Sequence, residues 1–403
     1  MKRIYKLTPV SQYDIAGMES WLQDMAARGL HLKKFRPLFC TFEKGPAAPM
    51  RYRVEPHRRA PDDDLPRQML ELYEDFGWDY ADEVNRTQLI FRTADPNAPE
   101  PHTDPELQAR GWRKMYRSDR NGFVVHVLSL FLLAGFLLYV LFGAGTPVYA
   151  AVTGPVLPLA LLLLFGVGSL APSYRDLSLL SALIRSLDAG VPMEHRAAYP
   201  RRRPWALPAF LAAVAIEVLL LVFWLILPLT GGQMRRVADA EGFTPLSLEA
   251  LEGADYEPYT MASDGFVDYA NFARPNRYLL STQWEVVQTG QWEEDGQWVR
   301  LEILWFDLPA PLSCLSRPLA QELLNRAMAL DDDIWWASET PAAWDVTYAP
   351  EAGFLAAARC EAGGFQAAAA AAGDKAVLVR YTGHGDLTEH WAELAGMVLP
   401  PDP

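Results

Sequence analysis

Four residues of types that commonly bind metal ions stand close together near the C-terminus, in the pattern His384-x-Asp386-x-x-Glu389-His390. The pattern lacks the first histidine of a His-x-x-Glu-His zinc motif. Asp386 and Glu389 instead have the spacing of a capping box, in which both side chains bind backbone N–H groups at the start of a helix. We therefore favour a helix start over a zinc site.

Tryptophan and acidic residues are both abundant in the C-terminal part of the chain. Together they could line a groove for a saccharide or a cationic ligand, through stacking and cation–π contacts. Tryptophans in strands more often pack into a core, and this is the interpretation that we favour. The residues concerned are Trp284, Trp292, Trp298, Trp305, Trp335, Trp336, Trp344 and Trp391.

Two aspartate runs, residues 62–64 and 331–333, resemble cation sites only in composition, because neither has the alternating ligands of a calcium loop. Asp64 fits a helix cap. The chain has no Gly-rich phosphate loop, Gly-x-Ser-x-Gly elbow or His-Glu-x-x-His motif. We therefore predict no metal, no cofactor and no catalytic residue. A disulfide between Cys314 and Cys360 is left open.

Three apolar runs, residues 123–142, 148–171 and 205–229, are long enough to cross a bilayer, which takes about 20 residues of helix. They predict three transmembrane helices, the second kinked by Pro155 and Pro158.

Glu217 lies near the middle of the third run, where a charge costs roughly 3 kcal/mol or more. The other two runs contain no Lys or Arg to pair with it. Such a carboxyl can serve as a proton contact or as a contact with a partner protein in the membrane, and Glu217 is the candidate for this role. We favour the alternative, a neutral Glu217 bonded to backbone or to Tyr139.

Basic residues flank the apolar runs unevenly. The connection of residues 143–147 has no charge, whereas the segment before the first run and the loop of residues 172–204 are rich in arginine. Since cytoplasmic loops carry the excess of Lys and Arg, we predict a cell-membrane protein with a cytoplasmic N-terminus and an extracytoplasmic C-terminus. An amphipathic helix near residues 175–190 is expected to lie along the inner surface or to pack on the first domain.

A basic stripe precedes the first run, with positions spaced i, i+3, i+4 and i+7 on one helix face. Such side chains gain about 1 kcal/mol each beside anionic lipid, so we predict contacts with lipid headgroups. Trp112 and Tyr116, on a neighbouring face, are of types that favour the membrane interface. We favour a topology anchor over a lipid sensor. The stripe consists of Arg110, Arg113, Lys114 and Arg117.

Charge divides the chain. Residues 1–121 hold 20 basic and 19 acidic residues, a net +1, whereas residues 233–403 hold 10 and 27, a net −17. Nucleic-acid binding needs a strongly basic surface, so we exclude it. We predict a cytoplasmic domain (residues 1–109), a membrane region (residues 110–232) and an acidic extracytoplasmic domain (residues 233–403).

Periodicity and caps predict an α+β fold for the first domain. The predicted order, β-α-β-β-β-α-β-β, suggests one antiparallel sheet with two helices on one face. The helices cover residues 14–29 and 64–77, and the strands cover residues 3–7, 30–35, 39–44, 51–54, 78–80 and 88–92.

Several blocks occur in order along this first domain: Asp14, Trp21-Leu22, Met25-Ala26, Gly29-Leu30, Phe42-Glu43-Lys44-Gly45, Arg51-Tyr52-Arg53, Tyr73-Glu74-Asp75-x-Gly77-Trp78 and Ile90-Phe91-Arg92. In these blocks the chain resembles the domain-of-unknown-function family 2812, over roughly residues 3–115. The resemblance implies a bacterial membrane protein, typically of Firmicutes, with a soluble domain ahead of its membrane helices. The family has no established catalytic residues to carry over.

The C-terminal domain also reads as α+β. A hairpin is predicted from strands at residues 283–288 and 297–306 around an acidic turn, and an alanine run at residues 366–372 is ambiguous. Further strands are expected at residues 344–347, 354–360 and 376–381, and helices at residues 318–330 and 386–397. The fold class is thus α+β soluble domains flanking three transmembrane α-helices.

Our leading hypothesis is a non-enzymatic membrane protein that links its two end domains in sensing, envelope response or assembly. One alternative is an accessory subunit of a membrane transporter, with Glu217 against a partner helix. Another is an extracytoplasmic saccharide-binding or hydrolase module.

Overall fold

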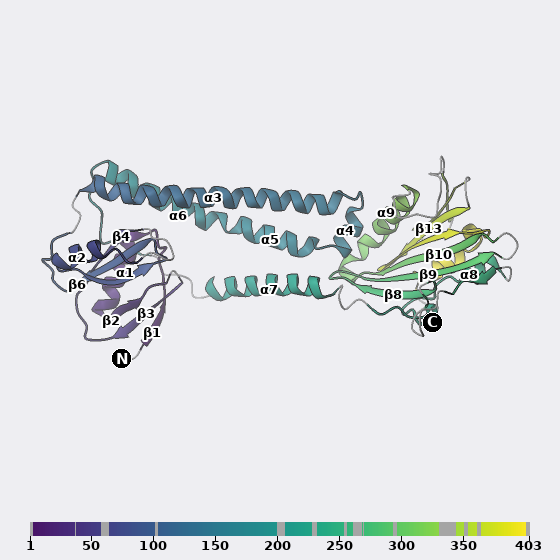
Figure 1. The fold of residues 1–403 in the computed structure, drawn as a ribbon, viewed down its shortest axis with the longest axis horizontal. Helices are drawn as coiled ribbons and strands as arrows, with labels where there is room; N and C mark the ends of the chain where they lie inside the picture. Colours follow the sequence, from purple (N-terminus) through teal and green to yellow (C-terminus); the bar gives the residue numbers. More distant parts are fainter. Residues whose placement is uncertain are drawn as a thin grey trace. The chain divides into compact units, whose positions relative to one another are not determined.

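The chain folds as a mixed α/β protein whose contacts divide it into two compact units (Figure 1). Unit 1 contains residues 1–132 and 163–213, and unit 2 contains residues 133–162 and 214–403. The computed structural model describes residues 3–36, 38–57, 64–100, 104–199, 206–227, 232–253, 256–260, 268, 270–292, 296–329, 344–349, 354–360 and 364–399.

The N-terminal domain of unit 1 has the predicted order of elements but not the predicted sheet. Its helices are α1 (Ile15–Ala27) and α2 (Arg67–Asp75). One antiparallel sheet has the order β1-β3-β2, and a second has the order β4-β6-β5. The strands are β1 (Arg3–Leu7), β2 (Leu30–Lys34), β3 (Phe39–Lys44), β4 (Arg51–Pro56), β5 (Asp79–Val84) and β6 (Gln88–Thr93).

The expectation of one sheet with both helices on one face is therefore wrong. In β6, Ile90 packs into the core that contains α1, whereas Leu89 and Phe91 pack on the opposite face with Tyr73 of α2. Alternation along a strand predicts which side chains share a face. Which strands pair with one another depends on contacts between residues far apart in the sequence.

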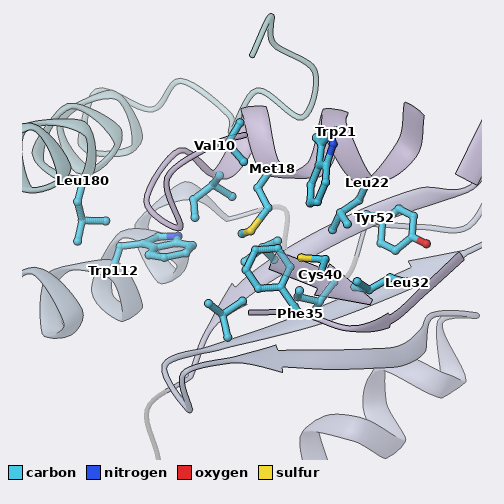
Figure 2. Packing of buried hydrophobic residues seen from close by; sticks show 14 of the residues in the cluster. Val10, Met18, Trp21, Leu22, Leu32, Phe35, Cys40, Tyr52, Trp112 and Leu180 are labelled. Carbon is cyan, nitrogen blue, oxygen red and sulfur yellow. The ribbon is translucent and has the colours of Figure 1, made fainter. Parts of the chain in front are cut away.

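The main core of unit 1 includes two helices outside this domain (Figure 2). They are α3 (Pro105–Phe142) and α6 (Leu170–Asp188). Trp112 of α3 and Leu180 of α6 are both 0 % exposed, in one cluster with Met18 of α1. Gly111 permits the close approach of α3, because a Cβ there would lie 2.7 Å from Pro56 Cγ. The expectation that Trp112 lies at the membrane surface is therefore wrong. Helix α6 packs on the first domain, which is one of the two positions expected for the amphipathic helix near residues 175–190.

Two helical stretches are long and apolar enough to cross a membrane, namely α3 and residues 156–188. No residue in the most apolar 18-residue stretch of α3 is buried within the protein. The predicted second span does not begin at residue 148. A short helix α4 (Pro147–Thr153) is capped by Gly154 just before Pro155, and α5 (Val156–Gly168) follows and leads into α6. Proline interrupts helices because it lacks an N–H donor.

The predicted third span corresponds to α7 (Ala206–Ile226), of which residues 211–226 form a shorter apolar helix. The described part of the chain therefore has two helices of spanning length by this measure, rather than three.

Unit 2 is built on an eight-stranded sheet with the order β11-β12-β13-β14-β10-β9-β7, in which β8 also pairs with β9. The predicted hairpin is confirmed, because β9 and β10 pair antiparallel. The strands are β7 (Tyr256–Pro258), β8 (Phe272–Arg277), β9 (Thr282–Trp292), β10 (Trp298–Asp307), β11 (Trp344–Tyr348), β12 (Phe354–Cys360), β13 (Phe365–Ala372) and β14 (Lys375–Thr382).

Each face of this sheet carries its own core. Helix α9 (Ser316–Ala329) covers one face together with α4, while α8 (Leu248–Glu252) and α10 (Trp391–Gly396) cover the other. The ambiguous alanine run is β13. Ala367 and Ala369 face the α9 side, and Ala368 faces the α10 side. The predicted last helix is shorter than expected, because a 3-10 turn (Leu387–Glu389) precedes α10.

Candidate functional site: a buried charge cluster and its docked segment

Five ionisable residues converge in unit 1 and are here named the charge cluster. Glu19 comes from α1, Arg53 and Glu55 from β4, and Glu100 from the segment after β6. His195 comes from residues 191–199, the segment after α6, here named the docked segment. Because side chains alternate along a strand, Arg53 and Glu55 share one face of β4.

Glu19 is the centre of the cluster and has a fully buried side chain. Its Oε1 accepts a hydrogen bond from Val54 N (2.9 Å), and its Oε2 lies 2.8 Å from His195 Nδ1 and 3.6 Å from Arg53 Nη1. Arg53 donates from Nε to Glu100 Oε2 (2.7 Å) and lies 5.3 Å from the centre of the Trp78 ring. The cluster therefore joins α1, β4 and the docked segment through charged groups.

Burial shifts the protonation of the cluster. It raises the pKa of Glu55 to about 8; the hydrogen bond from Tyr73 works against this shift, and the nearby Glu19 adds to it. Burial also raises the pKa of Glu19, and this effect outweighs those of His195 and Arg53. Burial also acts to raise the pKa of Glu100. The hydrogen bond and the positive charge of Arg53 outweigh it, so the pKa of Glu100 is lowered. Two of the three carboxyl groups are thus held closer to their neutral form.

Further hydrogen bonds hold the docked segment on α1. Ala197 N donates to Ser20 Oγ (2.9 Å), and Tyr199 donates from its hydroxyl to Asp24 Oδ2 (2.7 Å). Met193 and Tyr199 also pack against the main core of unit 1. The docked segment is therefore fixed to the N-terminal domain, at the position where a buried carboxyl meets a histidine.

Replacing His195 by alanine is expected to loosen the docked segment while leaving the domain folded. Removing the imidazole leaves the buried Glu19 carboxyl without this partner, which costs about 1–3 kcal/mol, so the amide of Ala197 should exchange its hydrogen roughly 5-fold faster or more. Hydrogen exchange with mass spectrometry measures this rate. Arg196→Ala, a change at the exposed neighbour, is the matched control. Equal exchange in wild type and His195→Ala would show that the contact with Glu19 does not hold the segment.

The sequence offers one signal for this cluster that the analysis of motifs missed. Glu19 lies four residues after Ile15 and three before Leu22, so it occupies the apolar face of α1. A charged residue on a buried helix face requires a partner. The partner, His195, is 176 residues away and carries no local signal.

The basic stripe is divided in the structure. Arg110, Lys114 and Arg117 are exposed, and Arg110 pairs with Glu106 one helical turn away (3.1 Å). Arg113 instead forms an ion pair with Asp188 at the end of α6. Contact of these residues with lipid headgroups stays a prediction.

Glu217 lies in α7 with its carboxyl oxygen Oε1 shielded from solvent, and it has no hydrogen-bond partner among the residues described. Its predicted role as a partner or proton contact is not tested by this arrangement. The described part of the chain shows no hydrogen bond between Glu217 Oε1 and Tyr139, the alternative contact.

The residues of the His384 to His390 pattern do not converge. His384 Nδ1 lies 3.5 Å from the buried Glu252 Oε2, and its ring contacts the Trp292 ring at a tilt of 37°. Asp386 caps the 3-10 turn by accepting from Thr388 N (2.8 Å), and His390 Nδ1 lies 3.5 Å from Glu393. Within the described residues, no three His, Cys, Asp or Glu side chains form a group that could hold a metal ion.

The described tryptophans of unit 2 range from buried to exposed. Trp284 and Trp305 are 4 % and 2 % exposed, whereas Trp298 is 53 % exposed and meets Tyr259 edge to face. Cys314 is an exposed free thiol, and Cys40 is buried and free. Asp62, Asp63, residues 331–333, Trp335 and Trp336 lie outside the described residues.

The fold and the site define a mixed α/β protein with an N-terminal domain fixed to two helices of spanning length. Residues 14–124 match the model of a family described as "Protein of unknown function (DUF2812)", which is consistent with the resemblance seen in the sequence. Neither a curated protein nor a solved structure matches the chain.

Proposed function

We propose that this chain is an integral membrane protein that couples a cytoplasmic DUF2812 domain to an extracytoplasmic domain through its apolar helices. It acts as a sensing or assembly module rather than as an enzyme. A change at one end alters the packing of helices that are continuous with the other end.

The observation that carries the proposal is the contrast along α3. At its beginning, Ala109, Trp112 and Met115 are buried in the core of unit 1. Its apolar stretch then has no buried residue, and large side chains such as Phe131 and Leu132 are 72 % and 75 % exposed. Apolar surface on this scale is stable only beside lipid or another protein.

The helix α4, which follows α3 along the chain, is anchored in the core of unit 2. Val152 is 1 % exposed, and Ser281 donates from Oγ to Val152 O (3.0 Å). Glu322 of α9 accepts hydrogen bonds from the backbone N–H of Val148 (2.8 Å) and Tyr149 (3.1 Å), which caps the start of α4. Firm attachment of α3 to one core and of α4 to another supports transmission along the helix.

A third crossing by α7 places the two ends in different compartments. Its 21 residues give a length of roughly 31 Å at 1.5 Å per residue, close to the thickness of the hydrocarbon layer. An odd number of crossings separates the termini, and an even number does not.

Thiol labelling tests this topology. The native Cys314 is exposed, whereas Cys40 is buried and burial raises its pKa to about 11, so Cys40 reacts poorly with maleimides. In a chain carrying Cys360→Ser, a membrane-impermeant maleimide should label Cys314 in intact cells. The matched chain keeps Cys360→Ser and also carries Cys314→Ser and Glu71→Cys in α2. It should be labelled only after lysis. Labelling of both chains before lysis, or of neither, would mean that the two domains share a compartment.

The two alternatives have less support. The saccharide-binding alternative needs a groove lined by tryptophan, but Trp284 and Trp305 lie in a core. The accessory-subunit alternative is compatible with the shielded Glu217 but leaves the anchoring of α4 unexplained.

A further inference from the structure

The three-stranded sheet β1-β3-β2 has one face in the core of unit 1 and one face exposed to solvent. Cys40 and Phe42 of β3 are both 0 % exposed and belong to the main core. Because side chains alternate along a strand, Phe39 and Thr41 lie on the opposite face. This opposite face is here named the outer face of the sheet, whose three strands lie side by side in Figure 1.

The outer face carries an apolar patch. Leu7 of β1 lies directly opposite Phe39 of β3, and the Tyr5 ring meets the Phe39 ring edge to face, with 6.3 Å between their centres. The exposed fractions of Tyr5, Leu7 and Phe39 are 63 %, 43 % and 44 %. Apolar side chains gathered on one exposed face, unlike single ones, indicate contact with another molecule.

Basic side chains surround the apolar patch. Arg3 lies opposite Glu43 on the outer face, and Lys34 of β2 lies on the same face and is exposed. Lys33 is also exposed, with Nζ 3.3 Å from Glu43 Oε1. The three strands contain five Lys or Arg residues, two in β1, two in β2 and one in β3, but Glu43 is their one acidic residue. Positive charge is therefore concentrated in this sheet, although residues 1–121 carry a net charge of only +1.

Charge selects the occupant of the outer face. A second copy of this chain would bring two basic faces together, and like charges in an interface cost free energy. Lys6, exposed in the edge strand β1, also disfavours pairing with a strand of another chain. An anionic membrane surface complements both features of the face. Its headgroups attract Lys and Arg, and aromatic side chains such as Tyr5 favour the membrane interface.

We propose that the outer face of the β1-β3-β2 sheet docks on an anionic lipid surface. The apolar patch then lies at the level of the headgroups, and Arg3 and Lys34 lie against lipid phosphates. The proposal rests on the membrane attachment proposed above. Helix α3 is anchored in the core of the same unit through Trp112, so it holds the domain near the bilayer. A weak surface contact is then sufficient, because it forms within one tethered molecule.

The test uses the purified full-length protein in nanodiscs of phosphatidylcholine, with and without phosphatidylglycerol. Both leaflets of a nanodisc have the same composition, so the result does not depend on which compartment the N-terminal domain occupies. Thr41→Cys, on the outer face, carries a bimane label in a chain with Cys314→Ser and Cys360→Ser. Lipids with a nitroxide on the headgroup quench a label at the bilayer surface. Phosphatidylglycerol should increase this quenching, and high salt should reverse the increase, because ions screen exposed charges. The same label at Glu71→Cys on α2, outside the face, should not respond.

Charge substitutions identify the face. Arg3→Gln combined with Lys34→Gln should lower the ratio of docked to undocked domain, roughly 5-fold for each residue, since both lose their attraction to anionic lipid. Arg67→Gln combined with Arg86→Gln is the matched control. It removes the same charge from exposed positions of the same domain outside this sheet. Tyr5→Ser leaves the charge unchanged and should weaken docking several-fold, because an aromatic contact with the interface is lost.

Quenching that does not depend on phosphatidylglycerol, or that falls equally in the two paired variants, overturns the proposal. So does protection of Thr41→Cys from a maleimide in native membrane vesicles but not in nanodiscs, which would indicate an acidic protein on this face. Co-elution of the chain with the nanodiscs is measured separately. A chain that does not insert contradicts the proposed membrane function and the docking together, whereas an inserted chain without quenching contradicts the docking alone.

Discussion

Replacing Trp112 by alanine is expected to lower the free energy of unfolding of unit 1 by about 3–5 kcal/mol, the range for deleting a large buried aromatic side chain. Trp112 is 0 % exposed and lies in one cluster with Met18 of α1 and Leu180 of α6. The loss combines the apolar transfer free energy of the indole ring with the cost of the cavity left behind. Pulse proteolysis of the protein in increasing urea measures the change.

The matched control for this change is Leu107→Ala, on the same helix. Leu107 is 55 % exposed, so its truncation should alter the free energy of unfolding by less than about 0.5 kcal/mol. Similar effects of the two substitutions would contradict the assignment of α3 to the core of the N-terminal domain. The proposed coupling would then lose its anchor at this end.

Replacing Glu55 by glutamine is expected to remove a large pH dependence of stability. Burial raises the pKa of Glu55 from 4.5 to about 8, so the folded protein holds a proton that the unfolded chain releases above its ordinary pKa. The free energy of unfolding therefore falls as the pH rises through this window, by about 1.4 kcal/mol per pH unit and roughly 5 kcal/mol in total. Glutamine stays neutral and is free of this loss.

Urea unfolding between about pH 5 and about pH 9 checks the prediction. Glu55→Gln should be similar to wild type at the acidic end and more stable at the basic end. Glu71→Gln, at an exposed site on α2, should follow the wild-type curve. Parallel curves for wild type and Glu55→Gln would mean that Glu55 ionises in the folded protein without penalty.

The charge cluster explains why a sequence search for motifs did not find a site. Short motifs report ligands that are close together along the chain, as in the His384 to His390 pattern. That pattern separates in space, with His384 near Glu252 and Asp386 in a cap. Glu19 and His195 do the reverse, since 176 residues separate two side chains whose atoms lie 2.8 Å apart. Only a folded chain creates such a pair.

Tertiary packing also overrode two local signals. Trp112 lies among basic residues and precedes an apolar run, which favours a membrane surface, but it is buried in one cluster with Leu180 and Met18. The alanine run of β13 has no strand preference of its own. It forms a strand because β12 and β14 pair with it on both sides, and its small side chains admit α9 on one face.

The sequence by itself determined the elements that depend on nearby residues: the order of helices and strands in the first domain, the β9–β10 hairpin and the apolar stretch of α3. Periodicity, caps and turns depend on residues a few positions apart, so they can be predicted without a structure. The division into two sheets and the docking of residues 191–199 on Glu19 were decided only by the tertiary structure. Their contacts join residues far apart in the sequence, and their free energies come from burial and desolvation, which exist only once the chain has folded.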